Sequence, residues 1–248
     1  MNYQRISVDL HIHSILSPCG DDMMTPCNLV GMAKLNGLDA IAVTDHNAME
    51  NVETALKVGQ AYEIVVVPGM ELETSEEIHV VCLFPNIESL AKFQQIVIDS
   101  YGENMPKNRP DIFGRQAICN DDDEVISEID RMLLAPSGIS IDDSFGIVES
   151  LGGIAYPAHV DRDSYSALAT LGAIPYGYKG GFVEISANCN KGELLNNYPE
   201  LEKYKHLPSS DAHYIDKIQE AEGAILFVEK LSPEGVIDAL KNNRIGTI

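Results

Sequence analysis

The stretch that decides the fold is Ile6-Ser7-Val8-Asp9-Leu10-His11-Ile12-His13, an apolar run that closes on two histidines with an aspartate beside them. The β-branched and apolar residues from Ile6 to Leu10 predict a short strand. Side chains alternate along a strand with a period of two, so the rings of His11 and His13 lie on one face of the extended chain. Both rings can therefore reach one cation, and imidazole with carboxylate is a ligand set that Zn²⁺, Mn²⁺ and Fe²⁺ accept.

Histidines and carboxylates follow other apolar runs in the same way. Six of the seven histidines end such a run or sit just beyond one, in the company of aspartate or glutamate. Any one of these pairs is also typical of a turn aspartate beside a surface histidine, but chance explains the whole set poorly. After the first block, the residues concerned are Asp21, Asp45, His46, Glu71, His79, His159, Asp211 and His213. Clustered divalent ions would indicate hydrolysis, above all of phosphate esters.

Strand and helix patterns alternate along the chain. Short apolar runs predict strands over residues 40–43, 64–67, 80–84, 154–157, 182–185, 207–210 and 224–228. Caps and helical spacing predict helices over residues 25–36, 51–62, 87–101, 121–134 and 233–242, a further helix near 151, and a loop over 102–110. Repeated β–α units imply parallel strands, and a parallel α/β barrel carries its chemistry at the carboxyl ends of those strands. The residues that fall at such ends are His11, His46, Glu71, His159 and Asp211.

The charge of the chain limits its partners. Its 38 acidic and 17 basic residues give a formal net charge of -21, so neither long nucleic acid nor an anionic membrane is expected to bind. Bound divalent ions would add positive charge to one pocket, so a small phosphorylated substrate can still be attracted. The five cysteines form neither a paired zinc spacing nor an even disulfide set, and the first residues lack the apolar core of a signal peptide. We therefore expect a reduced, cytoplasmic protein, whose oligomeric state the sequence does not indicate.

The motifs, in the order in which they stand, resemble those of the PHP family, which is named for polymerase and histidinol phosphatase. They read Asp-Leu-His-Ile-His-Ser at 9–14, Thr-Asp-His-Asn at 44–47, Pro-Gly-Met-Glu at 68–71, Ile-His-Val at 78–80, Pro-Ala-His at 157–159 and Ser-Ser-Asp-Ala-His at 209–213. The resemblance implies an α/β fold, a distorted TIM-like (β/α)7 barrel with the metal site at the C-terminal ends of the strands. It also implies a single PHP domain over residues 1–248, with an inserted loop and helical segment at about 102–145.

The resemblance further implies two or three divalent ions, drawn from Zn²⁺, Mn²⁺ and Fe²⁺. The expected ligands are His11, His13, Glu71 and Asp211 for the first ion, Glu71 as a bridge with His79 and His159 for the second, and Asp21, His46 and His213 for the third. Because Asp21 offers hard oxygen, the third site would favour Mn²⁺ or Mg²⁺ over Zn²⁺. Asp22 is an alternative to Asp21, and Cys19 in the same loop is a less favoured soft ligand.

The activity that the resemblance implies is metal-dependent hydrolysis of a small phosphate monoester by a metal-activated water. The substrate would be a nucleotide, a nucleoside bisphosphate or a compound like histidinol phosphate. Asp211, His213 and His46 are the expected catalytic residues, although the donor of the leaving-group proton stays open between the histidines and metal-bound water. A phosphatase also needs a cation for the phosphate oxygens, and Arg115 is the first candidate, with Arg162 second.

Three other functions stay open at this point. A phosphodiesterase acting on nucleic-acid ends would use similar metal chemistry, but the acidic charge counts against it. An amidohydrolase would use a carbamylated strand-end lysine as the metal bridge, and Glu71 takes that position here. A non-catalytic metal-binding module would need the same ligands without turnover.

Two carboxylates have roles that the sequence leaves less defined: Asp45 is expected to support His46, and Glu184 either reaches the site or is structural.

Overall fold

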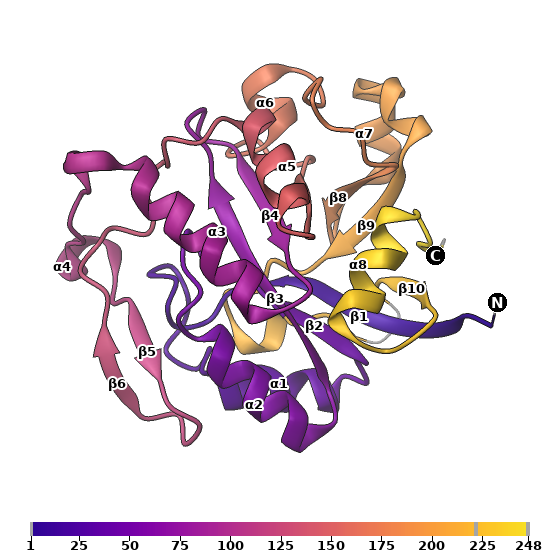
Figure 1. Ribbon diagram of the computed structural model, residues 1–248. Helices are drawn as coiled ribbons and strands as arrows, with labels where there is room; N and C mark the ends of the chain where they lie inside the picture. Colours follow the sequence, from indigo (N-terminus) through magenta and orange to yellow (C-terminus); the bar gives the residue numbers. More distant parts are fainter. Residues whose placement is uncertain (1, 221–222, 247–248) are drawn as a thin grey trace.

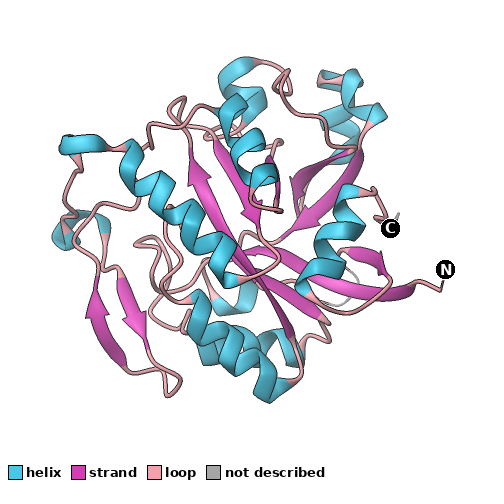
Figure 2. Ribbon diagram, in the orientation of Figure 1, coloured by secondary structure: helices cyan, strands magenta, loops and turns pink. Residues whose placement is uncertain are grey.

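A curled sheet of six strands in the order β10-β1-β2-β3-β4-β7 forms half of a barrel (Figures 1 and 2). The computed structural model describes residues 2–220 and 223–246, so the ends of the predicted 1–248 domain lie outside it. The strands of this sheet are β1 (Gln4–Ile12), β2 (Ala40–Val43), β3 (Val65–Glu73), β4 (His79–Leu83), β7 (Ile154–Pro157) and β10 (Ile225–Val228). A second, parallel pair consists of β8 (Phe182–Ser186) and β9 (Lys205–Ser209).

Helices cover the sheet as a TIM-like α/β fold requires, and that predicted fold class is confirmed. They are α1 (Pro26–Leu35), α2 (Val52–Tyr62), α3 (Ile87–Ser100), α5 (Ile141–Ser150), α6 (Ala167–Leu171), α7 (Lys191–Asn197) and α8 (Pro233–Lys241), with 3₁₀ turns η1 (Gly102–Asn104), η2 (Pro199–Lys203) and η3 (Ile215–Lys217). Among the described residues, none of these helices is long and apolar enough to cross a membrane.

Alternation along the strands divides the apolar residues between two cores. Ile41 and Val43 of β2 pack outward with residues of α1, α2, α3 and α5, whereas Ala40 and Ala42 join the core inside the barrel. In β3 the inward positions include Val67, and counting on by two residues brings Glu71 to the same inner face near the carboxyl end of the strand. The strand pattern itself therefore directs this carboxylate into the mouth of the barrel.

The expectation of a parallel sheet is wrong at two strands. β1, β2 and β3 are parallel, but β4 is antiparallel to both β3 and β7, and β10 is antiparallel to β1. Residues 74–78, which join β3 to β4, are too few for a crossover helix, so the chain turns back as a hairpin. As a consequence His79 opens β4 at the same edge at which β1, β2 and β3 end.

The helix predicted over residues 121–134 is also wrong. This part of the insertion forms a hairpin that projects from the body of the molecule (Figure 1), made of β5 (Ala117–Cys119) and β6 (Val125–Glu128) after a short α4 (Pro110–Phe113). The Asn120 side chain accepts the backbone N–H groups of Asp122 and Glu124, and this turn chemistry competes with a helix.

The acidic run in that turn does cap a helix, but the helix is α1, which lies earlier in the chain, and not one that follows the turn. The Asp123 carboxylate accepts the Thr25 hydroxyl at 2.7 Å and the Cys27 backbone N–H at 3.0 Å. Free N–H groups and the positive end of the helix dipole both favour a carboxylate at that place. The insertion is therefore fastened to the loop that precedes α1, which also carries candidate metal ligands.

Gly69 of β3 offers a direct test of how tightly this sheet is packed. A Cβ there would lie 2.7 Å from Thr44 Cγ2 and 3.0 Å from Leu83 Cδ2. We expect Gly69→Ala to lower the free energy of unfolding by ~1–3 kcal/mol in denaturant titrations, because the neighbours must shift. Gly146→Ala on α5, where nothing lies within 4 Å of the new Cβ, should leave stability unchanged or raise it by up to ~1 kcal/mol. Equal effects of the two substitutions would contradict the packing described.

Candidate metal centre

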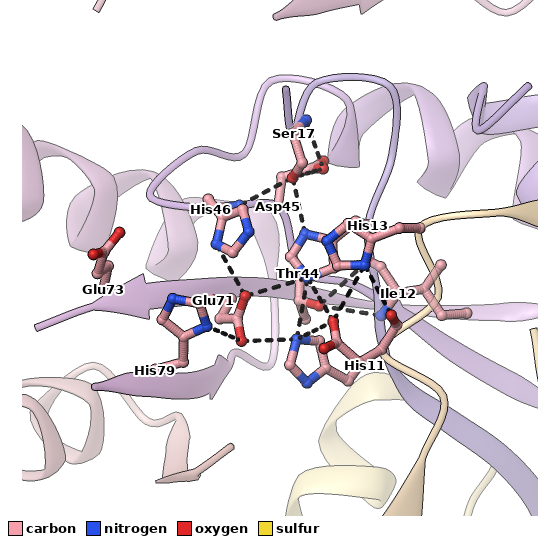
Figure 3. Close-up of polar contacts among 12 residues, drawn as sticks. His11, Ile12, His13, Ser17, Thr44, Asp45, His46, Glu71, Glu73 and His79 are labelled. Atoms are coloured by element: carbon pink, nitrogen blue, oxygen red, sulfur yellow. Dashed lines mark hydrogen bonds and ion pairs between the residues drawn. The ribbon is translucent and has the colours of Figure 1, made fainter. Parts of the chain in front are cut away.

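The buried carboxylate of Glu71 is surrounded by histidines (Figure 3). Five imidazole nitrogens lie within 3.3 Å of its two oxygens, from four different strands or the loops that follow them. Near Oε1 are His11 Nε2 at 3.1 Å, His79 Nδ1 at 3.0 Å and His159 Nε2 at 3.3 Å, and near Oε2 are His13 Nε2 at 3.2 Å and His46 Nδ1 at 3.0 Å. Glu71 is thus shared by almost all the histidines that the sequence singled out.

Polar atoms at this centre lack hydrogen-bond partners. Both Glu71 oxygens are buried without one, and so are Asp211 Oδ1, His46 Nδ1 and His159 Nδ1. Buried polar atoms of this kind are costly unless something else binds them. Three groups have ligand atoms within 4.8 Å of one another: His11, His13, Glu71 and Asp211; His46, Glu71 and His79; and His13, His46 and His213. The donor set and the unpartnered atoms fit divalent metal ions.

Backbone strain marks the same place. His159 and Asp211 follow β7 and β9 with φ of 27° and 49°, a region that side chains other than glycine seldom occupy. Each residue turns its side chain back toward Glu71 or toward the neighbouring histidines. Such strain persists where the surrounding structure enforces it and is concentrated at functional sites.

A second carboxylate orients His11. The Nδ1 atom of His11 lies 2.8 Å from Glu184 Oε1, and the backbone N–H of His159 donates to the same oxygen at 3.0 Å. Glu184 therefore holds a proton on Nδ1, which leaves the Nε2 lone pair facing Glu71 and Asp211. The role of Glu184, which the sequence left undecided, is to contact the site through His11.

His13 is oriented by a serine and an aspartate. Ser17 Oγ donates to Asp45 Oδ1 at 2.7 Å, so its oxygen accepts hydrogen bonds from His13 Nδ1 at 2.9 Å and from the His46 backbone N–H at 3.2 Å. The Asp45 carboxylate also accepts the Ser14 backbone N–H at 2.7 Å. Asp45 thus supports His46, as expected, and fixes the tautomer of His13 as well.

Two predicted site residues are not brought into the cluster. The Asp21 carboxylate accepts the backbone N–H of Met23 at 2.9 Å and belongs to none of the possible ligand groups in the described chain. Its backbone N–H, however, donates to the carbonyl of His213 at 2.9 Å. Arg115 lies on the insertion and pairs with Glu128 at 2.7 Å, exposed to solvent. The loop near Asp21 is therefore part of the site, whereas both of these side chains point elsewhere.

Arg162 does reach the centre. Its Nη1 atom lies 2.6 Å from Asp211 Oδ2 at the edge of a cleft of about 90 Å³, which Ser164 and Tyr165 also line. The Tyr165 ring stacks on His79 with centroids 4.8 Å apart, and its backbone φ is 53°. No pattern in the sequence singles out Ser164 or Tyr165, because nothing separates them from ordinary loop residues.

Cys19 lies against the histidines that Asp21 was expected to join. Its thiol lies near enough to His213 and His46 for these rings to affect its pKa. Burial acts to raise the pKa of the Cys19 thiol, but the neighbouring rings of His213, His46 and His13 outweigh it and lower the pKa to about 5. Like Asp21, Cys19 belongs to none of the possible ligand groups in the described chain.

Comparison with known proteins places this centre in context. A family model described as PHP domain matches residues 9–188. A segment of 79 residues is 32% identical to an uncharacterized protein of Methanocaldococcus jannaschii, over 29% of this chain and 46% of that protein. The lesion-specific endonuclease PfuEndoQ from Pyrococcus furiosus superposes with a TM-score of 0.66 at 17% identity, over 96% of this chain and 56% of that chain.

A two-domain protein from Bacteroides vulgatus, which contains a predicted PHP-like metal-dependent phosphoesterase, superposes with a TM-score of 0.55 at 17% identity. The match covers 98% of this chain and 64% of that chain. The chain thus spans between about half and two thirds of the length of these three proteins. At such identities the two solved structures show a common fold.

Removing the orienting carboxylate should weaken metal binding without disturbing the fold. We expect Glu184→Gln to lower the affinity for Mn²⁺ or Zn²⁺ by about 10–100-fold in competition titrations, because His11 loses the partner that fixes its tautomer. Glu193→Gln on the exposed side of α7 is the matched control and should bind as the wild type does. Unchanged affinity in Glu184→Gln, with a circular dichroism spectrum like that of the wild type, would show that the contact does not serve a metal.

Metal affinity should also depend on pH. Burial lowers the pKa of His11, but the charges of Glu184 and Glu71 outweigh it and hold the pKa well above its ordinary value of 6.5. His46 is shifted in the same direction, chiefly by Glu71 against the effect of burial. Protons therefore compete with metal ions for these rings even above pH 6.5, so affinity should continue to rise as the pH increases past that value. Calorimetric titrations in which affinity levels off below pH 6.5 would contradict this account.

Proposed function

The chain belongs to the PHP family, and from that premise we propose that it is a metal-dependent hydrolase of phosphate esters that acts on a small phosphate monoester. The observation that carries the proposal is the buried Glu71 carboxylate, whose two oxygens face five histidines and have no hydrogen-bond partner. A carboxylate with two oxygens can bridge two ions, and several clustered ions suit phosphate ester hydrolysis better than a single structural site does.

In this proposal the ligands divide among neighbouring ions around Glu71. The first ion would be held by His11, His13, Glu71 and Asp211, the second by Glu71, His79 and His159, and the third by residues that include His46 and His213. His11, His79 and His159 face Oε1, whereas His13 and His46 face Oε2, so both oxygens have imidazole nitrogens beside them, which supports a bridging role for the carboxylate. When bound, such ions act as Lewis acids on phosphoryl oxygens and lower the pKa of water.

The remaining side chains of the cleft bind and position the substrate. Arg162 is half-exposed and reaches Asp211 from the rim, so its guanidinium can turn to a phosphate oxygen as readily as to the carboxylate. Asp211, His213 and His46 line the same cleft and are the proposed catalytic residues. Asp211 holds Arg162 and also faces His11 and His13, so it couples substrate binding to the metal ligands.

Size and charge favour a small substrate. The cleft of about 90 Å³ admits a phosphate-sized group, and a protein of net charge -21 attracts extended polyanions poorly. A nucleic-acid phosphodiester is the second candidate substrate, because the fold of this chain superposes on a lesion-specific endonuclease over 96% of its length. Both substrate classes therefore need to be assayed.

Phosphate release by the full chain tests the proposal. With added Mn²⁺ the wild type should hydrolyse at least one class of small monoester, and Asp211→Asn should lower kcat/KM by about 100-fold or more, since one charged group of the centre is lost. Asp216→Asn in η3 is the control, because this exposed carboxylate pairs only with Lys217 among the described residues, and its activity should match that of the wild type.

Other results of these assays would contradict the proposal. Cleavage of a DNA duplex with an abasic lesion, with no release from any monoester, would favour the second candidate. Stoichiometric metal binding with no turnover on either class would contradict both, and would leave a metal-binding module.

A further inference from the structure

We propose that Tyr165 determines the substrate class of the cleft, by stacking on a planar aromatic ring of the molecule whose phosphate Arg162 binds. The substrate is then a phosphate monoester whose alcohol carries an aromatic ring, as a nucleoside does. The inference rests on the proposed phosphatase function and deepens it by naming the part of the substrate that lies outside the metal centre. It is carried by the contacts and exposure of the Tyr165 ring and by the fixed course of the loop over residues 160–166.

The size of the cleft separates the phosphate group from the rest of the substrate. The histidines, Glu71 and Asp211 line the cleft of about 90 Å³, and Arg162, Ser164 and Tyr165 complete it from one loop. This volume holds a phosphate group beside the metal ligands but not the alcohol to which the phosphate is esterified. The alcohol therefore lies at the rim, where these three loop residues are exposed. Tyr165 has the largest apolar surface of the three.

The Tyr165 ring covers His79 and still leaves much of its surface to solvent. The two ring centroids lie 4.8 Å apart, and the ring planes are inclined by 20°. Tyr165 is nevertheless 48% exposed. Among the described residues its ring has no second aromatic partner and its hydroxyl has no hydrogen-bond partner. An aromatic ring that is held in this way at the rim of a cleft is available to stack on a ligand.

The backbone of Tyr165 is strained in the conformation that places the ring there. Its φ of 53° lies in the left-handed region, which a bulky side chain seldom occupies. The Tyr165 carbonyl accepts the backbone N–H of His79 at 2.9 Å, so this conformation is held in place by a residue of the metal centre. Glycine would adopt it without strain. A tyrosine at this position is therefore better explained by what its ring contacts than by the turn itself.

The residues on either side fix the loop that carries both Arg162 and Tyr165. The Ser166 hydroxyl donates to the carbonyl of Arg162 at 2.6 Å, and the same side chain caps the start of α6. The Asp161 carboxylate accepts the backbone N–H of Ser186 in β8 at 2.8 Å. The loop is thus fastened to a helix and to a strand. A ring and a cation on a fixed loop lose little freedom when a ligand binds, which favours affinity.

Arg162 and Tyr165 suit two chemically different parts of one molecule. The guanidinium of Arg162 binds phosphate oxygens. Stacking on Tyr165 requires no charge, so the net charge of -21 does not oppose it. Every nucleobase has a flat π face, and stacking on an aromatic side chain strengthens its binding whichever base it is. A sugar phosphate without a base lacks this contact, so the cleft should bind it more weakly.

Binding of two analogues that resist hydrolysis tests the assignment on the full chain loaded with Mn²⁺. They are the methylene phosphonates of adenosine 5′-monophosphate and of ribose 5-phosphate, which differ only in the base. We expect the wild type to bind the adenosine analogue about 5–100-fold more tightly in calorimetric titrations, as base stacking on one aromatic ring provides. Tyr165→Phe should keep this ratio of dissociation constants, and Tyr165→Leu should abolish it.

The ratio separates recognition of the base from a structural role of Tyr165. A variant that only disturbs the loop or His79 would weaken the binding of both analogues alike, and the ratio would stay as in the wild type. Tyr176→Leu is the control, because Tyr176 is 91% exposed, lies beside Lys179 and does not line the cleft. Its ratio should match that of the wild type.

The outcomes distinguish this inference from the proposed function. Equal binding of the two analogues by the wild type, or a ratio that survives in Tyr165→Leu, would overturn the role of Tyr165 and leave a phosphatase intact if monoesters are hydrolysed. A preference lost in Tyr165→Leu, in a protein that hydrolyses no phosphate ester, would uphold the aromatic site and overturn the function. Failure of the metal-loaded wild type to bind either analogue would overturn the inference, and release of phosphate from other monoesters would still uphold the function.

Discussion

The arrangement of this centre depends on one buried carboxylate that has no hydrogen-bond partner within the described part of the protein. Glu71 faces five imidazole nitrogens, yet neither of its oxygens has a hydrogen-bond partner. Burial raises the pKa of Glu71, but the charges of the neighbouring histidines, His79 and His11 first, outweigh it and hold the pKa well below its ordinary value. Keeping several of these rings protonated inside the protein would be costly, whereas divalent cations can bind the carboxylate and the neutral rings together.

The fold delivers ligands to this carboxylate from both strand directions. β1, β2 and β3 end at the mouth of the half-barrel, and the antiparallel β4 begins there, so His79 arrives at the start of its strand. The pair β8 and β9 lies beside β1 and brings in Glu184 to orient His11. Ser17, held by Asp45, then fixes which nitrogen of His13 faces inward, as Glu184 does for His11. The strands position the rings, and the side chains that contact them fix their tautomers, so the site presents defined nitrogen atoms to a cation.

Local pattern was enough to predict that histidines and carboxylates at the strand ends lie together. The period of two along β1 correctly placed His11 and His13 side by side, with their Nε2 atoms 3.2 Å apart. The TIM-like α/β class and the PHP family followed from the same motifs. Sequence pattern could not supply strand direction at β4, because that depends on whether residues 74–78 form a crossover or a turn. It also mistook the acidic run near Asp123 for the start of a following helix, although that carboxylate caps α1 across 96 residues of chain.

Side-chain direction within loops was the other limit. The Asp21 carboxylate accepts the backbone N–H of Met23, and the sequence pattern could not show that this turn directs it away from the histidines. Anomalous diffraction from crystals grown with Zn²⁺ or Mn²⁺ tests the central claim most directly. The account predicts two ions bridged by Glu71, each at roughly 2.0–2.2 Å from a carboxylate oxygen. Ordered crystals with the histidine cluster intact and no anomalous peak within bonding distance of Glu71 would contradict it.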